Sequence, residues 1–394
     1  MFQSLPVQPA DPILALMAAY RDDPRPGKID LGIGVYKNAA GVTPVMRAVK
    51  VAEERLWRDQ ETKSYIGFLG DPGFNDAMIR LVLGDALPRQ NVAAAAAPGG
   101  TGAVRQAFEA IREANPDARV FISDPSWVNH ASMLDHVGLA RKSYRYFDAE
   151  SRGIDFDGMM EDLSDLGAGD VLLLHGCCHN PTGADLNSVE WQAVRALLAR
   201  TGALPMIDLA YMGFGDGLEA DAGPVRDLVA ELPEALIAVS CSKNFGLYRD
   251  RAGVLIATAQ DGTLAPRLGD TLAHLNRQNF SFPPDHATRV VSTILDDVDL
   301  SADWLDELNG MRGRIQSVRQ ALANELQRIT GSDRFHFLSR HRGMFSRLGA
   351  SREQVEMLRD RHGVYMVGDS RMNVAGLTES SVPVLAAAIA EVGL

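Results

Sequence analysis

Residues 170–208 read DVLLLHGCCHNPTGADLNSVEWQAVRALLARTGALPMID, and this stretch decides the fold. It begins with a short apolar run (170–176), continues through a helical pattern from Asn187 to Arg200, and ends in a second apolar run (203–208). A strand, a helix and a second strand in this order predict two parallel strands joined by a crossover helix. Similar runs rich in Val, Ile and Leu occur at VFIS (120–123), ALIAVS (235–240) and AGVLIA (252–257). We therefore expect an α/β protein with a mostly parallel central sheet and helices on both faces.

Two parts of the chain depart from this alternation. The runs at 235–240 and 252–257 are too close together for a crossover helix, so we expect one antiparallel neighbour. Residues 303–329 carry apolar side chains near a 3.6-residue period, which predicts one long helix. A smaller α+β domain is expected after it, with strands at FHFL (335–338), MFSRLG (344–349) and VYMVG (364–368) and helices at about 352–361 and 381–391.

Composition limits the classes of function. The 394 residues include 39 Lys and Arg against 51 Asp and Glu, a formal net charge of −12, which argues against general nucleic-acid binding. Three cysteines, two of them adjacent, are not a disulfide framework and are typical of a reducing compartment. The first residues lack the pattern of a signal peptide, and no apolar run approaches the roughly 18 residues of a membrane span. We expect a cytoplasmic protein with no nucleic-acid or membrane partner.

The segment SCSKNFG (240–246) is the strongest local cluster of chemistry-bearing residues. It follows the apolar run at 235–240, and ligands of α/β sheets bind at the carboxyl ends of strands. The hydroxyls of Ser240 and Ser242, with Arg251 further along, can contact a phosphate, and Lys243 offers an amine nucleophile. A solvated loop with an inactive lysine is the alternative.

Two further segments also lie at expected strand ends. Asp208 ends the run at 203–208, with Tyr211 three residues later, so its carboxylate can face a ligand or simply cap a helix. PGGTG (98–102) follows the expected strand VAAAAA and leads into a helical segment; its Gly100 and Thr101 can present backbone amides to an anion. It does not fit G-x-G-x-x-G, which favours a cofactor phosphate over a dinucleotide, and a plain turn remains the alternative.

The segment HGCCHNPTG (175–183) invites a metal interpretation. His175, Cys177 and His179 share a face only in an extended chain, at a spacing of about 6.6 Å, which is too wide for zinc ligands without a tight turn. We predict no metal here, and instead a loop that delivers Asn180 to a site.

Two arginines and a tryptophan complete the candidate set. Arg277 and Arg371 are either solvated or bidentate clamps for carboxylates, for which a guanidinium is well suited. Trp127 belongs to the core or offers a stacking face.

Taken together, these segments resemble the aspartate/aromatic-amino-acid aminotransferases, the class I pyridoxal-phosphate family of fold type I. The resemblance covers essentially the whole chain and is greatest to bacterial aromatic-amino-acid aminotransferases. Its motifs, in chain order, are LGIGVYK, TKSYIGFLGDP, PGGTGAVRQA, SDPSWVNH, HGCCHNPTG, IDLAYMGFGDG, SCSKNFGLYRDRAG, NRQNFSFPP and SRMNVAG. With so many motifs in order, the metal and dinucleotide interpretations fall away.

The resemblance implies pyridoxal 5'-phosphate as cofactor, attached to Lys243 as a Schiff base. Asp208 would pair with the protonated ring nitrogen, Tyr211 and Asn180 would bind the ring's phenolic oxygen, and Trp127 would stack on the ring. The implied phosphate ligands are Gly100, Thr101, Ser240, Ser242 and Arg251, with Tyr65 of the neighbouring subunit.

The resemblance also implies the substrates and the assembly. Arg371, assisted by the backbone at Gly34, would hold the α-carboxylate of the substrate, and Arg277 from the other subunit would hold a distal carboxylate. Trp127 and Asn180 would border the substrate as well. Amino acids and 2-oxo acids would react in ping-pong order through a pyridoxamine-phosphate form, in a homodimer with shared active sites. We expect a large cofactor-binding domain at 45–310 and a small domain built from 1–44 and 311–394.

Substrate preference depends on a few positions. Two residues stand where strict aspartate enzymes usually carry asparagines: Ser64 and Phe282. Their presence should loosen Arg277, so that an aromatic side chain can use the same pocket. We therefore expect transamination of aromatic amino acids and aspartate with 2-oxoglutarate. The alternatives are a strict aspartate aminotransferase, a pyridoxal-phosphate lyase or decarboxylase on the same fold, and a non-enzymatic binding protein. The residues that keep the pattern of enzymes accepting aspartate and glutamate are Val35, Lys37, Thr43, Thr101 and Arg277.

Overall fold

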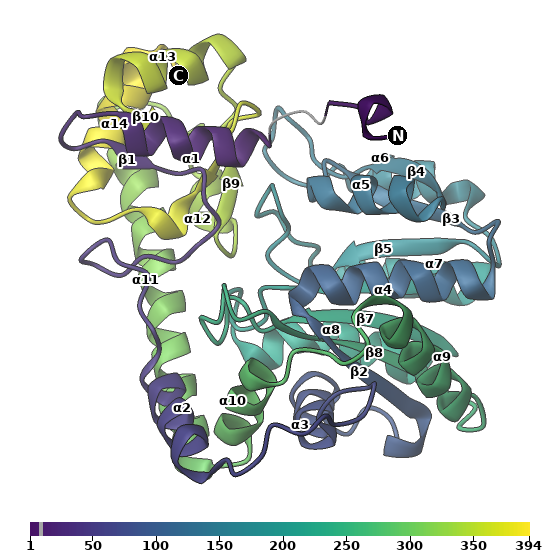
Figure 1. Ribbon diagram of the computed structural model, residues 1–394. Helices are drawn as coiled ribbons and strands as arrows, with labels where there is room; N and C mark the ends of the chain where they lie inside the picture. The colour runs from purple at the N-terminus through teal and green to yellow at the C-terminus, as the bar shows by residue number, and fades with distance from the viewer. Residues whose placement is uncertain (8–10) are drawn as a thin grey trace. The chain divides into compact units, whose positions relative to one another are not determined.

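The computed structural model describes residues 1–7 and 11–394. Two compact units divide the chain (Figure 1). Residues Pro44–Arg314 form the larger unit, and Met1–Thr43 with Ile315–Leu394 form the smaller unit.

The larger unit is built on a seven-stranded sheet with the order β2-β8-β7-β6-β5-β3-β4. Strands β3 to β7 pair in parallel, whereas β8 is antiparallel to both of its neighbours. The carboxyl ends of β2, β3, β5, β6 and β7 therefore meet at one edge of the sheet. The strands are β2 (Val92–Pro98), β3 (Arg119–Asp124), β4 (Ala140–Arg145), β5 (Val171–His175), β6 (Leu204–Leu209), β7 (Glu234–Ser240) and β8 (Ala252–Ala259).

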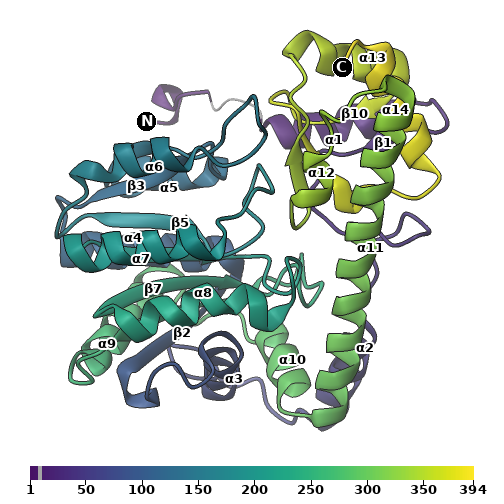
Figure 2. The same cartoon turned by 180° about the vertical axis from the view of Figure 1, so that it is seen from behind.

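Helices cover both faces of this sheet. On one face, apolar side chains of α4, α5 and α9 pack against alternate residues of the strands, such as Val120 and Ile122 of β3. Figure 2 shows α7 and α8 against the opposite face. The helices of this unit are α2 (Arg47–Asp59), α3 (Pro72–Leu83), α4 (Gly99–Ala114), α5 (Val128–Val137), α6 (Phe156–Asp162), α7 (Ser188–Thr201), α8 (Leu218–Glu231), α9 (Leu264–Asn279) and α10 (His286–Leu295), with short 3₁₀ turns at Arg89–Asn91 and Leu163–Asp165.

The smaller unit is α+β, with its own apolar core. Its two small sheets pair β1 with β10 in parallel and β9 with β11 in antiparallel orientation. Helix α11 (Val298–Thr330) contributes residues to both units. The other elements are α1 (Pro12–Asp22), β1 (Ile29–Asp30), α12 (Phe337–Arg340), β9 (Phe345–Arg347), α13 (Arg352–His362), β10 (Val364–Tyr365), β11 (Arg371–Asn373) and α14 (Ser381–Glu391), with 3₁₀ turns at Phe2–Ser4 and Val374–Gly376.

Most strands expected from the sequence are present, and the strand expected at 335–338 is wrong. That segment leads into α12, and its apolar residues Phe335, Phe337 and Leu338 are all buried in the core of the smaller unit. Adjacent side chains of a strand point to opposite faces, so a strand could not bury Phe337 and Leu338 on the same side. Within the described residues, no helix has the length and apolar character needed to cross a bilayer.

Candidate functional site

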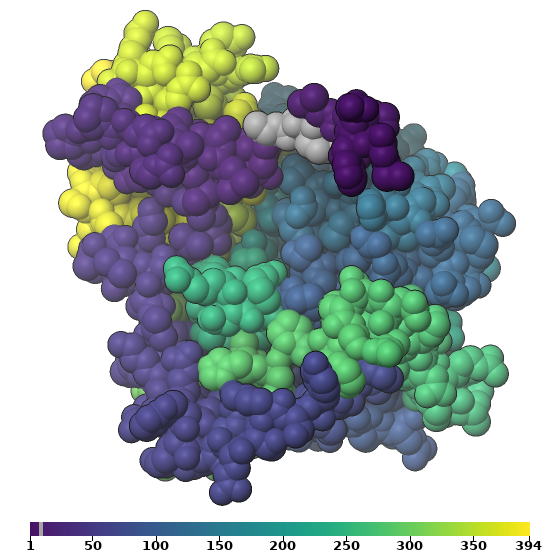
Figure 3. Space-filling model, viewed as in Figure 1, coloured from purple at the N-terminus to yellow at the C-terminus, as the bar shows by residue number. Residues whose placement is uncertain are grey.

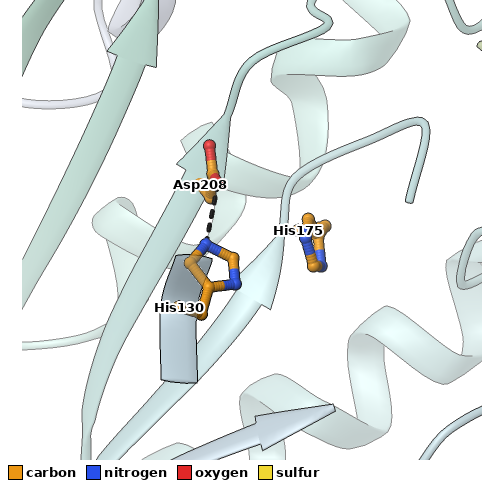
Figure 4. A group of neighbouring side chains, drawn as sticks. All are labelled: His130, His175 and Asp208. Carbon is orange, nitrogen blue, oxygen red and sulfur yellow. Dashed lines mark hydrogen bonds and ion pairs between the residues drawn. The ribbon is translucent and has the colours of Figure 1, made fainter. Parts of the chain in front are cut away.

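A buried carboxylate lies where β6 ends. Asp208 is only 6% exposed, and its Oδ2 lies 3.0 Å from Nε2 of His130 on α5 (Figure 4). Burial alone would raise the pKa of Asp208, but the hydrogen bond with His130 and nearby positive charge hold the pKa below its usual value. Asp208 is therefore an anion that accepts the Nε2 proton of His130, and Nδ1 of the same ring lies 2.9 Å from the hydroxyl oxygen of Ser126.

His175 closes the other side of this group. It ends β5, where it pairs in register with Asp208, and its ring lies 5.3 Å from that of His130. Burial lowers the pKa of His175 to about 3, so its ring is neutral. Asp208 thus keeps its charge next to a neutral imidazole, and it can hold the protonated nitrogen of a heterocyclic ring.

Lys243 presents an amine close to Asp208. It follows β7, and its Nζ lies 4.8 Å from the centre of the Tyr211 ring. Burial lowers the pKa of Lys243 to about 8; the Asp208 charge opposes this shift and Arg251 adds to it. About a tenth of the amine is then unprotonated at pH 7, far more than for a free lysine, and the unprotonated form is the one that acts as a nucleophile or general base.

An anion cradle forms where α4 begins. Arg251, with φ 62°, donates from Nη1 to Ser242 Oγ at 3.1 Å and to the Tyr248 carbonyl at 2.9 Å. The helix starts at Gly99 without a side-chain cap, so its first N–H groups remain available to an anion. Gly99 has φ 74°, and a Cβ there would lie 2.3 Å from Nη2 of Arg251. The guanidinium, the hydroxyls of Ser240 and Ser242 and the start of α4 at Gly100 and Thr101 fit a phosphate.

PGGTG is thus the end of β2 and the first turn of α4, and not a separate loop. This placement strengthens the anion-binding interpretation, because amides of a helix start carry the positive end of the helix dipole.

Asn180, Tyr211 and Trp127 lie around the same strand ends. Asn180 is buried, and within residues 1–7 and 11–394 its Oδ1 has no hydrogen-bond partner. Tyr211 is buried beneath the Lys243 amine. Trp127 precedes α5, and its ring meets that of His130 edge-on at 5.2 Å. The buried amide of Asn180 and the indole of Trp127 are both suited to contacts with a polar aromatic ligand.

Both ring nitrogens of His179, one of the residues in the metal interpretation of 175–183, already have hydrogen-bond partners. Its Nε2 lies 3.0 Å from Ser123 Oγ, and its Nδ1 lies 2.9 Å from Thr182 Oγ1. Cys177 and Cys178 instead lie near Asp221, whose carboxylate already accepts three backbone N–H groups, those of Gly213, Gly215 and Asp216. These contacts agree with the expectation of a loop that carries Asn180, which stays a prediction.

Tyr65 and Arg277 are not joined to this group. Tyr65 is 82% exposed and stacks on Phe282 at 4.4 Å, whereas Arg277 lies over Phe68. In the part of the chain that the structure describes, no hydrogen bond or ring contact links either residue to Lys243 or Asp208. Their expected roles remain predictions that require a second copy of the chain.

The smaller unit brings Arg371 and Gly34 together. The buried Arg371 donates from Nη2 to the Gly32 carbonyl at 3.0 Å, and its Cζ lies 4.6 Å from the centre of the Phe345 ring. A Cβ on Gly34 would lie 2.8 Å from Cζ of the same ring. The Phe345 ring therefore contacts both the Arg371 guanidinium and the backbone at Gly34, and a guanidinium next to backbone groups is suited to a carboxylate.

Sequence reasoning missed His130, His175 and Phe345 as parts of these groups. Ser126 and His130 are four residues apart in SDPSWVNH, and this short separation is the signal that could have paired them, with Ser126 just before α5 and His130 in its first turn. Nothing in the sequence near Phe345 points to Arg371 or Gly34, because the three meet only through tertiary contacts.

Comparison with known proteins adds the family. A family model described as aminotransferase class I and II matches residues 26–389. The aromatic-amino-acid aminotransferase of Paracoccus denitrificans is 54% identical over 394 residues, 100% of both chains, and the aspartate aminotransferase of Escherichia coli K12 is 43% identical over 395 residues, again 100% of both. The structure of the aromatic-amino-acid aminotransferase from Burkholderia pseudomallei, covalently bound to pyridoxal phosphate, matches with a TM-score of 0.97 and 38% identity over 100% of this chain and 99% of that one.

Proposed function

The chain belongs to the class I and II aminotransferases, which depend on pyridoxal phosphate, and we propose that it moves amino groups between aromatic amino acids or aspartate and 2-oxoglutarate. The observation that carries the chemistry is the partly buried Lys243 amine, with a pKa of about 8, near the buried carboxylate of Asp208. The substrate assignment is supported by full-length likeness to both an aromatic and an aspartate aminotransferase.

When bound, the cofactor withdraws electrons from the α-carbon of the substrate and so acidifies its proton. Lys243 would hold the cofactor covalently, and Asp208, oriented by His130, would keep its ring nitrogen protonated. The phosphate would lie in the cradle of Gly100, Thr101, Ser240, Ser242 and Arg251. Asn180 and Tyr211 would donate to the phenolic oxygen, Trp127 would cover one ring face, and Tyr65 of a second copy would reach the phosphate.

In this proposal Lys243 is the base. Lys243 would be released when the amine of the substrate takes its place on the cofactor, and its free Nζ would then accept the proton from the α-carbon of the substrate and donate it to the cofactor carbon that retains the amino group. The low pKa of Lys243 keeps enough free amine for this step near neutral pH. The first substrate leaves as a 2-oxo acid before the second enters, which gives ping-pong kinetics.

Two arginines would select the substrate. Arg371 would bind the α-carboxylate common to all substrates, next to the backbone at Gly34. Arg277 of a second copy would bind the distal carboxylate of aspartate or glutamate, so the working enzyme would be a homodimer with shared active sites. We expect Ser64 and Phe282 to leave Arg277 without the polar partners that would keep it in the substrate pocket, so it would move aside for an aromatic side chain. With all three cysteines free thiols, we expect the enzyme in the cytoplasm.

The test is an absorbance titration of the purified enzyme with phenylalanine and, separately, with aspartate, in the absence of any 2-oxo acid. Loss of the yellow cofactor absorbance with each, and release of one equivalent of 2-oxo acid without ammonia or carbon dioxide, is the expected result. A response to aspartate alone would make the chain a strict aspartate aminotransferase. No response to either amino acid would overturn the proposal.

A further inference from the structure

The cationic end of Arg277 rests on an aromatic surface of its own chain. Three rings, those of Tyr65, Phe68 and Phe282, form what we call the aromatic cluster. Tyr65 stacks on Phe282 at 4.4 Å with 12° between the planes, and Phe282 packs against Phe68 at 4.9 Å. The Cζ of Arg277 lies 5.3 Å from the centre of the Phe68 ring, within the range of a cation–π contact.

A hydrogen bond fixes the direction of the guanidinium. Nη1 of Arg277 donates to Ser281 Oγ at 2.5 Å, four residues further along the chain. Ser281 itself has φ 68°, so the chain turns sharply after α9 and brings the hydroxyl back toward Arg277. The guanidinium is thus held between one ring face and one hydroxyl.

Asn276, the residue before Arg277, is hydrogen-bonded to the backbone of Phe68. Asn276 is 1% exposed, and its Nδ2 donates to the Phe68 carbonyl at 2.8 Å. Its Oδ1 accepts from Gln106 Nε2 at 2.8 Å, which anchors the same amide to α4. Figure 3 shows the chain near residue 65 (dark blue) beside the chain near residue 280 (green) on the surface of the larger unit. These hydrogen bonds hold the backbone next to Arg277 close to the backbone of Phe68, so the guanidinium stays near the Phe68 ring.

We propose that Phe68 and Ser281 form a resting dock for the Arg277 guanidinium, and that the strength of this dock sets the ratio of aspartate to aromatic turnover. The inference rests on the proposed function. A dicarboxylic substrate must draw Arg277 off the dock, so the dock weakens its binding. An aromatic substrate needs the guanidinium out of its way, and the dock supplies a place for it.

Phe282 and Tyr65 form the rest of the aromatic cluster and pack around Phe68. Phe282 packs between the other two rings and holds Phe68 with its face toward Arg277. The phenylalanine at position 282 therefore acts through the position of a neighbouring ring, and not only through the loss of a polar group.

The decisive variant is Phe68→Leu, which keeps an apolar side chain but removes the π face. The ratio of kcat/KM for aspartate to that for phenylalanine should rise by about two- to fivefold, the range of an exposed cation–π contact. The affinity for maleate, a dicarboxylate inhibitor, should rise by a similar factor, whereas that for 3-phenylpropionate should fall or stay constant. Phe68→Tyr should restore the wild-type ratio, and Ser281→Ala should shift it in the same direction as Phe68→Leu.

The same substitution in an Arg277→Ala background isolates the mechanism. If Phe68 acts through Arg277, Phe68→Leu changes the substrate ratio in the wild type and leaves it constant when Arg277 is absent. An equal loss for both substrates, or the same shift in both backgrounds, would overturn the dock. Wild-type enzyme inactive on phenylalanine would instead refute the proposed dual specificity, and the maleate affinities would still decide the dock.

Discussion

The strand ends around Lys243 and the surface around Arg277 differ in burial and in how firmly their charged groups are held. Asp208 and His130 are buried and joined at 3.0 Å, and the pKa values of Asp208 and Lys243 are shifted by their surroundings. Arg277 is exposed, and it is held by one ring face and one hydroxyl. Bond chemistry common to all substrates needs fixed charges in a dry setting, whereas a choice between substrates needs a charge that can move at small cost.

Removing the amine from the buried region should have the largest effect. Lys243→Ala should lower kcat by roughly 10⁴-fold for aspartate and phenylalanine alike, because no base remains for the α-proton. The cofactor should still bind through the cradle and Asp208. Single-turnover absorbance measurements check the rate, and Lys142→Ala, which removes an exposed lysine of β4, is the control. A loss of kcat with only one of the two substrates would contradict the view that Lys243 acts on every substrate and Arg277 on one class of substrate.

Removing the exposed charge should instead affect only one class of substrate. Arg277→Ala should lower kcat/KM for aspartate by roughly 10²-fold, since a carboxylate loses its charge partner. Turnover of phenylalanine should change by no more than a few fold. Steady-state kinetics with both donors provide the measurement, with Arg267→Ala on the same helix as control. Equal losses of kcat/KM with both donors would show that Arg277 does not bind the distal carboxylate.

The cradle should respond to a single methyl group. Gly99→Ala places a Cβ against Arg251 at a residue with φ 74°, so the guanidinium must shift. Affinity for pyridoxal phosphate should fall by roughly tenfold, as expected for one disturbed charge-assisted hydrogen bond. Titration of cofactor-free protein measures it. Gly223→Ala on α8, where a Cβ meets open space, should leave the affinity unchanged.

The smallest effect concerns stability and pH. The pKa of Lys243 is about 8 in the folded protein, against about 10.4 for a free lysine, so the folded state binds fewer protons between these values. Stability of the cofactor-free protein should therefore rise as pH increases from about 8 to 10. Lys243→Met should be more stable than wild type by roughly 1–2 kcal/mol at pH 7, with the gap closing toward pH 10. Urea unfolding at both pH values tests it; a constant gap would mean that the amine is charged without penalty.

The larger unit was more predictable than the smaller one. Strands β5, β6, β7 and β8 lie within two residues of the apolar runs in the sequence, because each is buried on both faces and reads as continuous Val, Ile and Leu. The long helix was also expected, although it begins five residues earlier than its apolar pattern. The segment at 335–338 misled because Phe-His-Phe alternates as a strand would, while the core of the smaller unit required Leu338 on the same side as Phe337.

The candidate site was predictable only where local motifs carry it. Lys243, Asp208 and Arg251 lie in segments whose position at strand ends follows from the alternation of strands and helices. The hydrogen bond between His130 and Asp208 spans 78 residues, and the contact between Phe68 and Arg277 is equally non-local. Such pairs depend on how helices pack on the sheet, which no local pattern encodes.

The reversed strand β8 has a consequence for how this protein can change. Because β8 returns antiparallel to β7, residues 241–251 leave and re-enter the sheet at the same edge, and Lys243 and Arg251 sit on one short connection. The spacing between the amine of Lys243 and the guanidinium of Arg251 is therefore set by the length and path of one continuous segment. A substitution at a position other than Ser242, Lys243 or Arg251 leaves this spacing in place, whereas an added or deleted residue would move the amine relative to the guanidinium. The segment must therefore keep its length as well as these three side chains.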